Sequence, residues 1–71
     1  MKLTAILHKE GDMYVAWCPE LDIASQGLTL EEAKSNLQEA LSLFVAYASK
    51  EEIRSRLSED LHITPIEVAI A

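Results

Sequence analysis

Residues 28–49 constrain the fold most, because they have the pattern of one long amphipathic helix. The apolar positions recur every three or four residues and so fall on one side of a helix. They are Leu30, Ala33, Leu37, Ala40, Leu41, Phe44, Val45 and Ala48. Thr29 and Glu32 have the spacing of a capping box, which predicts where the helix begins, and Gly27 allows a sharp turn just before it. The rest of the chain must supply an apolar surface for this helix to cover.

The residues before the helix predict three strands joined by short links. Residues 1–9 alternate as a strand does and end at a turn in which Gly11 is expected at positive φ. Residues 13–18 are apolar on both faces, which is typical of a central, covered strand. Pro19 ends that strand, and residues 21–26 form a short third one. We therefore expect an antiparallel meander.

The residues after the long helix predict a further helix and a last strand. Residues 50–60 suggest a second short helix or a kinked extension, and residues 66–70 alternate as a strand after Pro65. The fold class is then α+β with the order β-β-β-α-(α)-β. A right-handed crossover places the last strand parallel to the first, for a sheet order of 3-2-1-4 with the helix on one face.

One face of such a sheet remains bare, and a bare apolar face marks an interaction surface. The pattern does not decide which of two alternating sets faces outward, because the second strand is apolar on both sides. The candidates are Ile6, Met13, Tyr14, Val15, Trp17 and Cys18.

The chain's 71 residues make one domain with a marginal core. Small domains often compensate with disulfides, metals or oligomerisation. Cys18 is the single cysteine, so an intrachain disulfide is excluded, and Cys18 with His8 and His62 is a poor metal-ligand set. We therefore expect a homo-oligomer, a dimer or tetramer, with no cofactor and no metal.

The net charge of −6 disfavours direct binding to nucleic acid or to an anionic membrane. It favours a basic protein partner through complementary fields, although the same charge can serve only to keep a small protein soluble. No segment has the length of a membrane span, and the lone thiol is typical of a cytoplasmic protein.

Few side chains have the arrangement that catalysis requires. Cys18 with His8 could form a nucleophile and base, but Cys18 lies in an apolar strand, where a small hydrophobe is the usual role. Glu20 and Asp22 could act as a paired acid and base, but solvated loop carboxylates are the commoner case. We expect that the protein is not an enzyme.

Residues 14–43 carry a series of short motifs in a fixed order. After the aromatic-rich strand these are Pro19-Glu20-Leu21, Gly27, Thr29-Leu30-Glu31-Glu32-Ala33 and Glu39-Ala40. The series resembles the HicB antitoxin family, whose pattern has an aromatic-rich strand, Pro-acidic-Leu, a short strand ending in Gly, Thr-x-x-Glu-Ala opening a helix, and a second Glu-Ala. The resemblance implies a domain like a truncated RNase H fold. It also implies a role, which is to bind a small basic RNA-cleaving toxin, HicA, and to cover its catalytic histidine.

Two properties of related proteins are not expected here. The strands lack the clustered carboxylates of RNase H chemistry, so no nuclease activity is implied. Full-length HicB antitoxins end in a helix-turn-helix or ribbon-helix-helix segment, whereas residues 1–71 read as a single HicB-like domain without a separate DNA-binding domain.

The sequence therefore favours an antitoxin-like module that binds its partner around the second strand and the following turn. The predicted contact residues are Tyr14, Trp17, Pro19, Glu20, Leu21 and Asp22. Aromatic side chains would act as anchors, and carboxylates would steer a basic partner. The alternatives are a self-assembling structural domain without a toxin and, less favoured, a small enzyme or ligand carrier.

Overall fold

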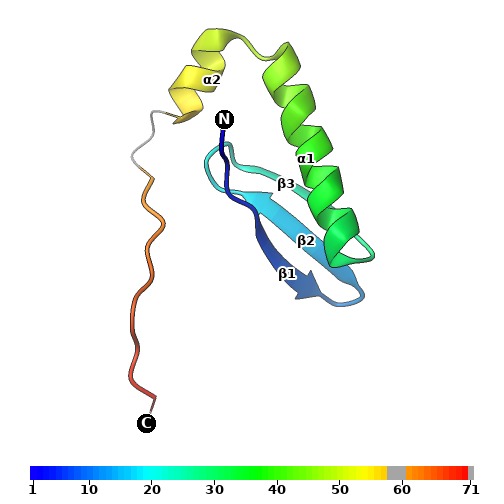
Figure 1. The fold of residues 1–71 in the computed structure, drawn as a ribbon, viewed down its shortest axis with the longest axis vertical. Coiled ribbons are helices and arrows are strands. Elements are labelled where there is room, and N and C mark those ends of the chain that lie inside the picture. The colour runs from blue at the N-terminus through cyan, green and yellow to red at the C-terminus, as the bar shows by residue number, and fades with distance from the viewer. Residues whose placement is uncertain (58–60, 71) are drawn as a thin grey trace.

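The computed structural model of the chain describes residues 1–57 and 61–70 (Figure 1). Within these residues the α+β class is confirmed, with three strands followed by two helices. The elements are β1 (Ile6–Glu10), β2 (Met13–Cys18), β3 (Ile23–Gly27), α1 (Leu30–Tyr47) and α2 (Lys50–Leu57).

The strands form the predicted antiparallel meander, with β2 between β1 and β3 in the described part of the chain. The turn between β1 and β2 holds Gly11 at a φ of 61°, as its position in the sequence suggested. A residue without a Cβ adopts this left-handed conformation at little cost. Short links between neighbouring strands thus account for the whole sheet.

Helix α1 lies across one face of the sheet (Figure 1). Its start is confirmed, because the Thr29 side chain accepts a hydrogen bond of 3.0 Å from the Glu32 N–H. The helix packs mainly against β3 and β2 and contacts β1 least. The face of α1 that is apolar in sequence is therefore not evenly covered by the sheet.

The core between α1 and the sheet is small. Its fully buried apolar residues, among those described, are Ala16, Cys18, Leu21, Ala33 and Leu37, surrounded by half-buried Leu3, Leu7, Tyr14, Ile23, Leu41 and Phe44. Small side chains on β2 allow the helix to approach the sheet closely. This arrangement leaves the domain with little apolar burial for its length.

The role of Gly27 differs from the one that the sequence suggested, which was to allow a sharp turn before the helix. It is the last residue of β3 and lies directly under the first turn of α1. A Cβ at this position would stand 2.6 Å from the Ala33 amide nitrogen and 2.9 Å from the Glu32 carbonyl carbon. Glycine is therefore needed here for the close approach of strand and helix.

Helix α2 confirms the predicted second helix over residues 50–57, whereas residues 58–60 of the predicted range lie outside the described residues. The Ser49 hydroxyl accepts a hydrogen bond from the Glu52 N–H at 3.0 Å and caps its start. Arg56 anchors the helix to the domain, because it donates to the Leu21 carbonyl and stands 4.8 Å from the centre of the Phe44 ring. Neither α2 nor any other described helix has the length and apolar character needed to cross a membrane.

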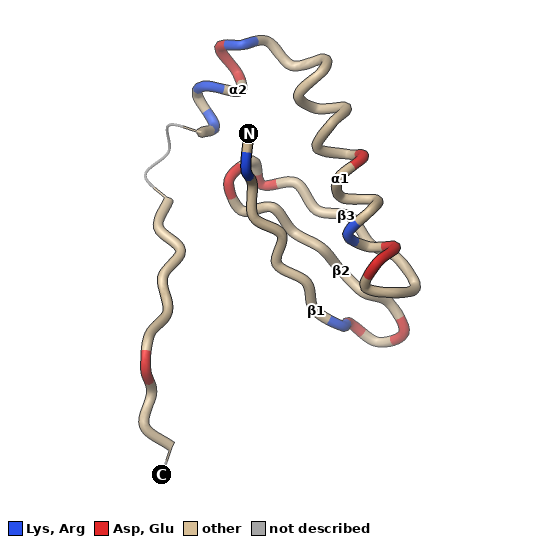
Figure 2. Tube along the Cα trace, in the orientation of Figure 1, with Lys and Arg blue, Asp and Glu red and all other residues tan. Residues whose placement is uncertain are grey.

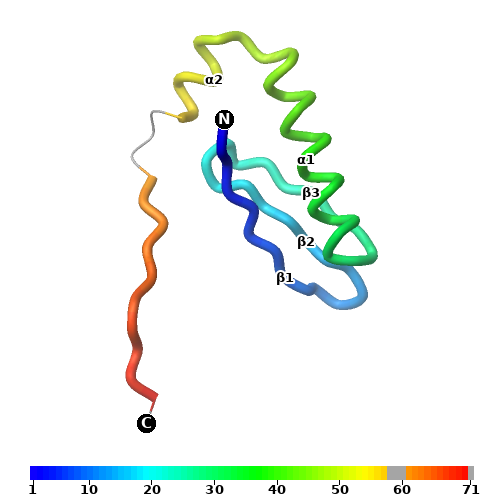
Figure 3. Tube along the Cα trace, in the orientation of Figure 1, coloured from blue at the N-terminus to red at the C-terminus, as the bar shows by residue number. Residues whose placement is uncertain are grey.

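The C-terminal arm, which we define as residues 61–70, differs from the prediction. The expected strand over residues 66–70 is not part of the sheet, so neither the parallel fourth strand nor the order 3-2-1-4 is present in the described residues. The arm is extended away from the sheet, and all ten of its residues are exposed (Figures 1 and 3). Alternating apolar residues form a strand only where a sheet edge accepts their backbone groups, and here the arm leaves α2 without meeting one.

Candidate functional site

The face of the sheet opposite α1 is largely apolar, and we call it the outer face. Its apolar residues are Ile6, Met13, Val15, Trp17 and Ala24. Ala16 and Cys18 are buried under α1, and side chains alternate along a strand, so Val15 and Trp17 point to the other side. The structure thus decides which alternating set of β2 faces outward.

Strand register places Trp17 on the central strand, near one end of this surface. Trp17 is opposite Ile6 on β1 and opposite Ala24 on β3, while Val15 is opposite His8 and Gln26. Side chains at paired positions of one face are in contact distance of one another. The indole therefore has an aliphatic neighbour on one side and a small residue on the other, and it remains 37% exposed.

A carboxylate holds the indole at one end of the outer face. The Trp17 Nε1–H donates a hydrogen bond of 3.0 Å to the Asp22 Oδ1, and both residues are exposed. Asp22 has a φ of 52°, a left-handed conformation that aspartate tolerates better than most residues. The turn between β2 and β3 thus presents an aromatic ring and an acidic group side by side.

Acidic residues lie at both ends of the sheet (Figure 2). Glu20 and Asp22 belong to the turn between β2 and β3, whereas Glu10 and Asp12 flank the turn between β1 and β2. On β1 the exposed Glu10 Oε2 is 3.4 Å from the His8 Nε2. An apolar surface with carboxylates at its ends matches the usual pattern of a protein interface, which has an apolar centre and a polar rim.

Glu20, unlike Asp22, is engaged inside the domain. Its carboxylate accepts the Thr4 N–H at 3.0 Å to each oxygen and the Thr4 hydroxyl at 2.6 Å. Partial burial alone would raise the pKa of Glu20, but the hydrogen bonds from Thr4 outweigh it, so that the pKa is lowered. Glu20 therefore fastens the segment before β1 to the turn after β2.

Three further residues predicted to bind a partner face inward. Tyr14 packs on the α1 side at the border of the core, and Pro19 and Leu21 are buried in the turn after β2. Of the six predicted residues, the structure brings Trp17 and Asp22 together on the accessible surface. The residues that the prediction lacked are Thr4, which binds Glu20, and Ala24, which completes the outer face.

The structure does not bring Cys18 and His8 together. Cys18 is fully buried below α1, whereas His8 is exposed on the outer face. Burial raises the pKa of the Cys18 thiol; a backbone hydrogen bond at Leu21 opposes this rise, and the neighbouring Glu20 carboxylate adds to it. A thiol held protonated in the core behaves as a small hydrophobe. No cluster suited to a metal ion occurs among the described residues.

The chain is similar over its whole length to a UPF0150 protein of Helicobacter pylori (strain J99 / ATCC 700824). The two are 33% identical over 72 residues, and the alignment covers 100% of each chain. No protein-family model and no solved structure matches the chain at a significant level.

Proposed function

The chain belongs to the UPF0150 protein family, and we propose that it works as a HicB-like antitoxin module. In this role it binds a small, basic, RNA-cleaving toxin of the HicA type and neutralises it by protein–protein contact. The observation that carries the proposal is the exposed pair of Trp17 and Asp22, held together at 3.0 Å directly beside the HicB-like Pro-acidic-Leu motif.

The pair has the chemistry of an interface anchor. Tryptophan is enriched among the residues that contribute most to binding, because it buries a large apolar area and also offers a polar N–H. Here the indole is already held by a hydrogen bond, so less side-chain entropy is lost when a partner covers it. The aliphatic residues around it on the outer face would exclude water from the contact.

The charge of the domain suits a basic partner. The net charge of −6 and the acidic residues at both ends of the sheet produce a field that attracts a cationic protein and accelerates encounter. Asp22 lies next to the anchor and is available to a lysine or arginine of the partner. Glu20 is already bonded to Thr4 and contributes mainly to the long-range field.

The test uses the intrinsic fluorescence of Trp17, which is the single tryptophan of the chain. A purified HicA-type toxin, with its catalytic histidine replaced to allow expression, is titrated into the protein. We use a tryptophan-free toxin so that all emission comes from Trp17. We expect saturable binding near one toxin per chain, with a blue shift and protection from an aqueous quencher.

The Trp17→Ala variant, followed by calorimetry, should weaken binding by more than about 1 kcal/mol, roughly fivefold or more. Tyr47→Ala is the matched control, because Tyr47 is an exposed aromatic residue on α1, away from the outer face. A toxin that binds both variants as tightly as the unchanged chain would remove Trp17 from the site. A failure of any basic toxin to bind would refute the function itself.

The second candidate, a self-assembling domain without a toxin, is favoured by the apolar character of the same outer face. In that case a second copy of the chain would cover Trp17. The emission of Trp17 would then shift to the red on dilution of the protein alone, with no toxin present. The same fluorescence measurement thus separates the two functions.

A further inference from the structure

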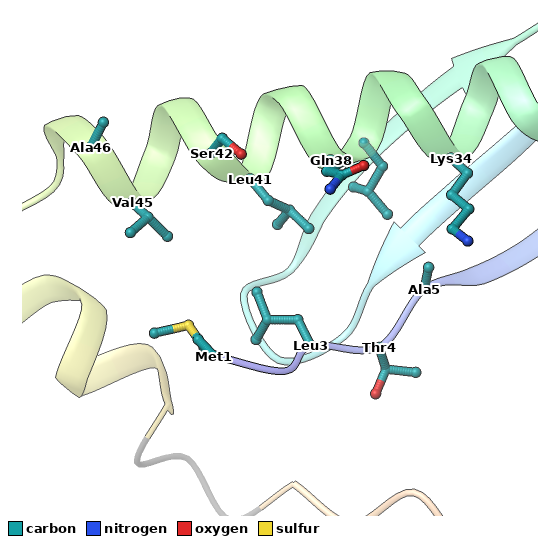
Figure 4. A pocket seen from close by; sticks show the side chains of 11 residues that line it. Met1, Leu3, Thr4, Ala5, Lys34, Gln38, Leu41, Ser42, Val45 and Ala46 are labelled. Carbon is teal, nitrogen blue, oxygen red and sulfur yellow. The ribbon is translucent and has the colours of Figure 1, made fainter.

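A groove runs along α1 beside the segment that precedes β1 (Figure 4). Its volume is about 680 Å³, and its apolar lining includes Leu3, Leu37, Leu41 and Val45. Figure 4 shows Met1 and Leu3 on one side and the side chains of α1 on the other. The groove exists because α1 packs mainly over β3 and β2, so that its side nearest β1 has little to cover it.

The sheet also has a free edge at β1, the strand that directly follows the segment lining the groove. β1 pairs with β2 on one side, and no described residue pairs with its other side. Unpaired N–H and C=O groups at a sheet edge are a template for another strand. A strand added to this edge could continue beside the segment that precedes β1 and place its side chains in the groove.

The C-terminal arm has the pattern that such a position requires. Ile66, Val68 and Ile70 are 80%, 75% and 96% exposed, and they share one face of an extended chain. Glu67 is on the opposite face, as the single acidic position of the arm (Figure 2). Pro65, which cannot donate to a strand ladder, stands just before this stretch.

The dimensions of the arm and the groove agree. From Ile66 to Ile70 an extended chain covers about 13 Å, with successive same-face side chains about 6.6 Å apart. From Leu37 to Val45 the helix covers about 12 Å, with Leu41 in the middle at steps of about 6 Å. The apolar side chains of the arm therefore have nearly the same spacing as the apolar positions of the helix, of which Leu41 and Val45 remain accessible while Leu37 is already buried.

The surface of the isolated chain is too large for its mass. It exposes 5819 Å², whereas a compact monomer of 7.9 kDa exposes about 4,400 Å². Its radius of gyration is 14.2 Å, against about 11 Å for a compact domain of this length. The chain therefore exposes about 1,400 Å² more than a compact monomer would, and the fully exposed arm contributes to this excess. A contact that covered this excess on two chains would remove about 2,800 Å², which is in the range of permanent dimers.

We propose that two copies of this chain exchange their C-terminal arms. Residues 66–70 of each copy add as a fourth strand to the free edge of β1 in the other, and Ile66, Val68 and Ile70 fill the groove below α1. A second copy is the occupant because Arg56 fixes α2 to Leu21 and Phe44, and from α2 the arm extends away from the groove of its own chain. Each copy has one arm and one groove, so the exchange closes as a dimer.

This inference does not rest on the proposed function, because the exchange uses the edge of β1 and leaves the outer face open.

Analytical ultracentrifugation of the full chain should show a dimer. Val68→Glu should raise its dissociation constant at least about 100-fold, since both arms lose the burial of a valine. Ala69→Glu, with the same charge one position along and on the opposite face, should leave the dimer intact. Trp17 emission should not change when the dimer forms.

A disulfide test decides between exchange and docking within one chain. Chains carrying Ser42→Cys, at an exposed groove position of α1, are mixed with chains carrying Val68→Cys and oxidised. If the arms exchange, this mixture gives a covalent heterodimer. The control replaces Ser42→Cys with Ser35→Cys, an exposed position of α1 outside the groove lining, and should give no heterodimer. The native Cys18 is fully buried and is protected from this reaction.

Three results would overturn the exchange. The first is a monomer in which Ser42→Cys and Val68→Cys, combined in one chain, close an intrachain disulfide. The second is a dimer that Val68→Glu does not weaken and in which Trp17 becomes protected, because this would place the contact on the outer face. The third is a monomer whose arm stays unpaired in both measurements.

Discussion

Replacing Glu20 with glutamine tests how the N-terminal segment is held against the sheet. The Glu20 carboxylate accepts the Thr4 N–H through both oxygens at 3.0 Å and the Thr4 hydroxyl at 2.6 Å. Residues 1–5 belong to no strand, so these bonds to a residue 16 positions away are an important fastening of that segment. Glutamine has nearly the same shape but is neutral and offers one acceptor oxygen instead of two.

The expected loss follows from the number and kind of bonds. Hydrogen bonds to a charged group contribute about 1.5–3 kcal/mol each when buried, and water replaces part of that where the group is half-exposed. Since glutamine can keep one of the contacts, we expect Glu20→Gln to lower the free energy of unfolding by about 1–2 kcal/mol at neutral pH.

The effect should depend on pH in one direction. The folded-state pKa of Glu20 is lowered from its ordinary value of 4.5, so its contribution is fully present above that value. The contribution is lost as the pH falls through the lowered folded-state pKa. Urea unfolding of both proteins between neutral pH and pH below 4.5 should therefore show a difference that shrinks towards acid.

A cycle with Thr4→Val identifies the partner. Thr4→Val removes the hydroxyl and keeps the backbone N–H. The double variant should lose about 0.5–1.5 kcal/mol less stability than the sum of the two single losses, and this difference is the coupling energy between Thr4 and Glu20. A stability difference that stays constant over the whole pH range would refute the reasoning. So would full additivity of the two substitutions.

Two further substitutions test the packing of the helices. Gly27→Ala places a Cβ 2.6 Å from the Ala33 nitrogen and should lower the stability measured by thermal unfolding by about 1–3 kcal/mol. The control is Gly11→Ala, which has open space around its Cβ and should lose only the strain energy of its φ of 61°. Equal losses in the two variants would contradict the close approach of strand and helix at Gly27. Arg56→Met removes the hydrogen-bond donor to the Leu21 carbonyl and should raise the rate of amide hydrogen exchange in α2 at least about tenfold. Arg54→Met, on the same helix, should leave that rate unchanged. Equal exchange rates in the two variants would show that Arg56 does not anchor α2.

The main helix and the meander could be predicted because their signals are local. The N-cap at Thr29 and the three- and four-residue spacing after it fix α1 without reference to any other element. Gly11 and Pro19 likewise mark the ends of β1 and β2 through their own backbone chemistry. The class and the order of these elements follow directly.

The faces of the sheet could not be predicted, because β2 is apolar on both sides. Ala16 and Cys18 turn inward since their small side chains allow α1 to lie close, and this leaves Trp17 outside. That choice depends on packing between elements, which periodicity alone does not report. Alternation along β2 already separates Tyr14 from Trp17, and packing decides only which of the two faces outward.

The site around the turn after β2 depended on contacts between distant residues. The residues Pro19-Glu20-Leu21 do not indicate that Thr4 will donate hydrogen bonds to the Glu20 carboxylate or that Leu21 will be buried. The alternation in residues 66–70 indicates a strand, but the sheet edge that such a strand joins is not specified by the residues themselves.

The order in which the elements are joined has a consequence for synthesis. Every strand pair in the described structure links neighbours in sequence, and α1 follows at once, so this unit can fold with few long loops to close. The arm that we propose for the edge of β1 comes from a second copy, so this edge stays bare after synthesis until two chains meet. Because that encounter involves two molecules, the bare interval shortens as the chain becomes more concentrated. During it this edge, rather than the core, is the most vulnerable part of a newly made chain.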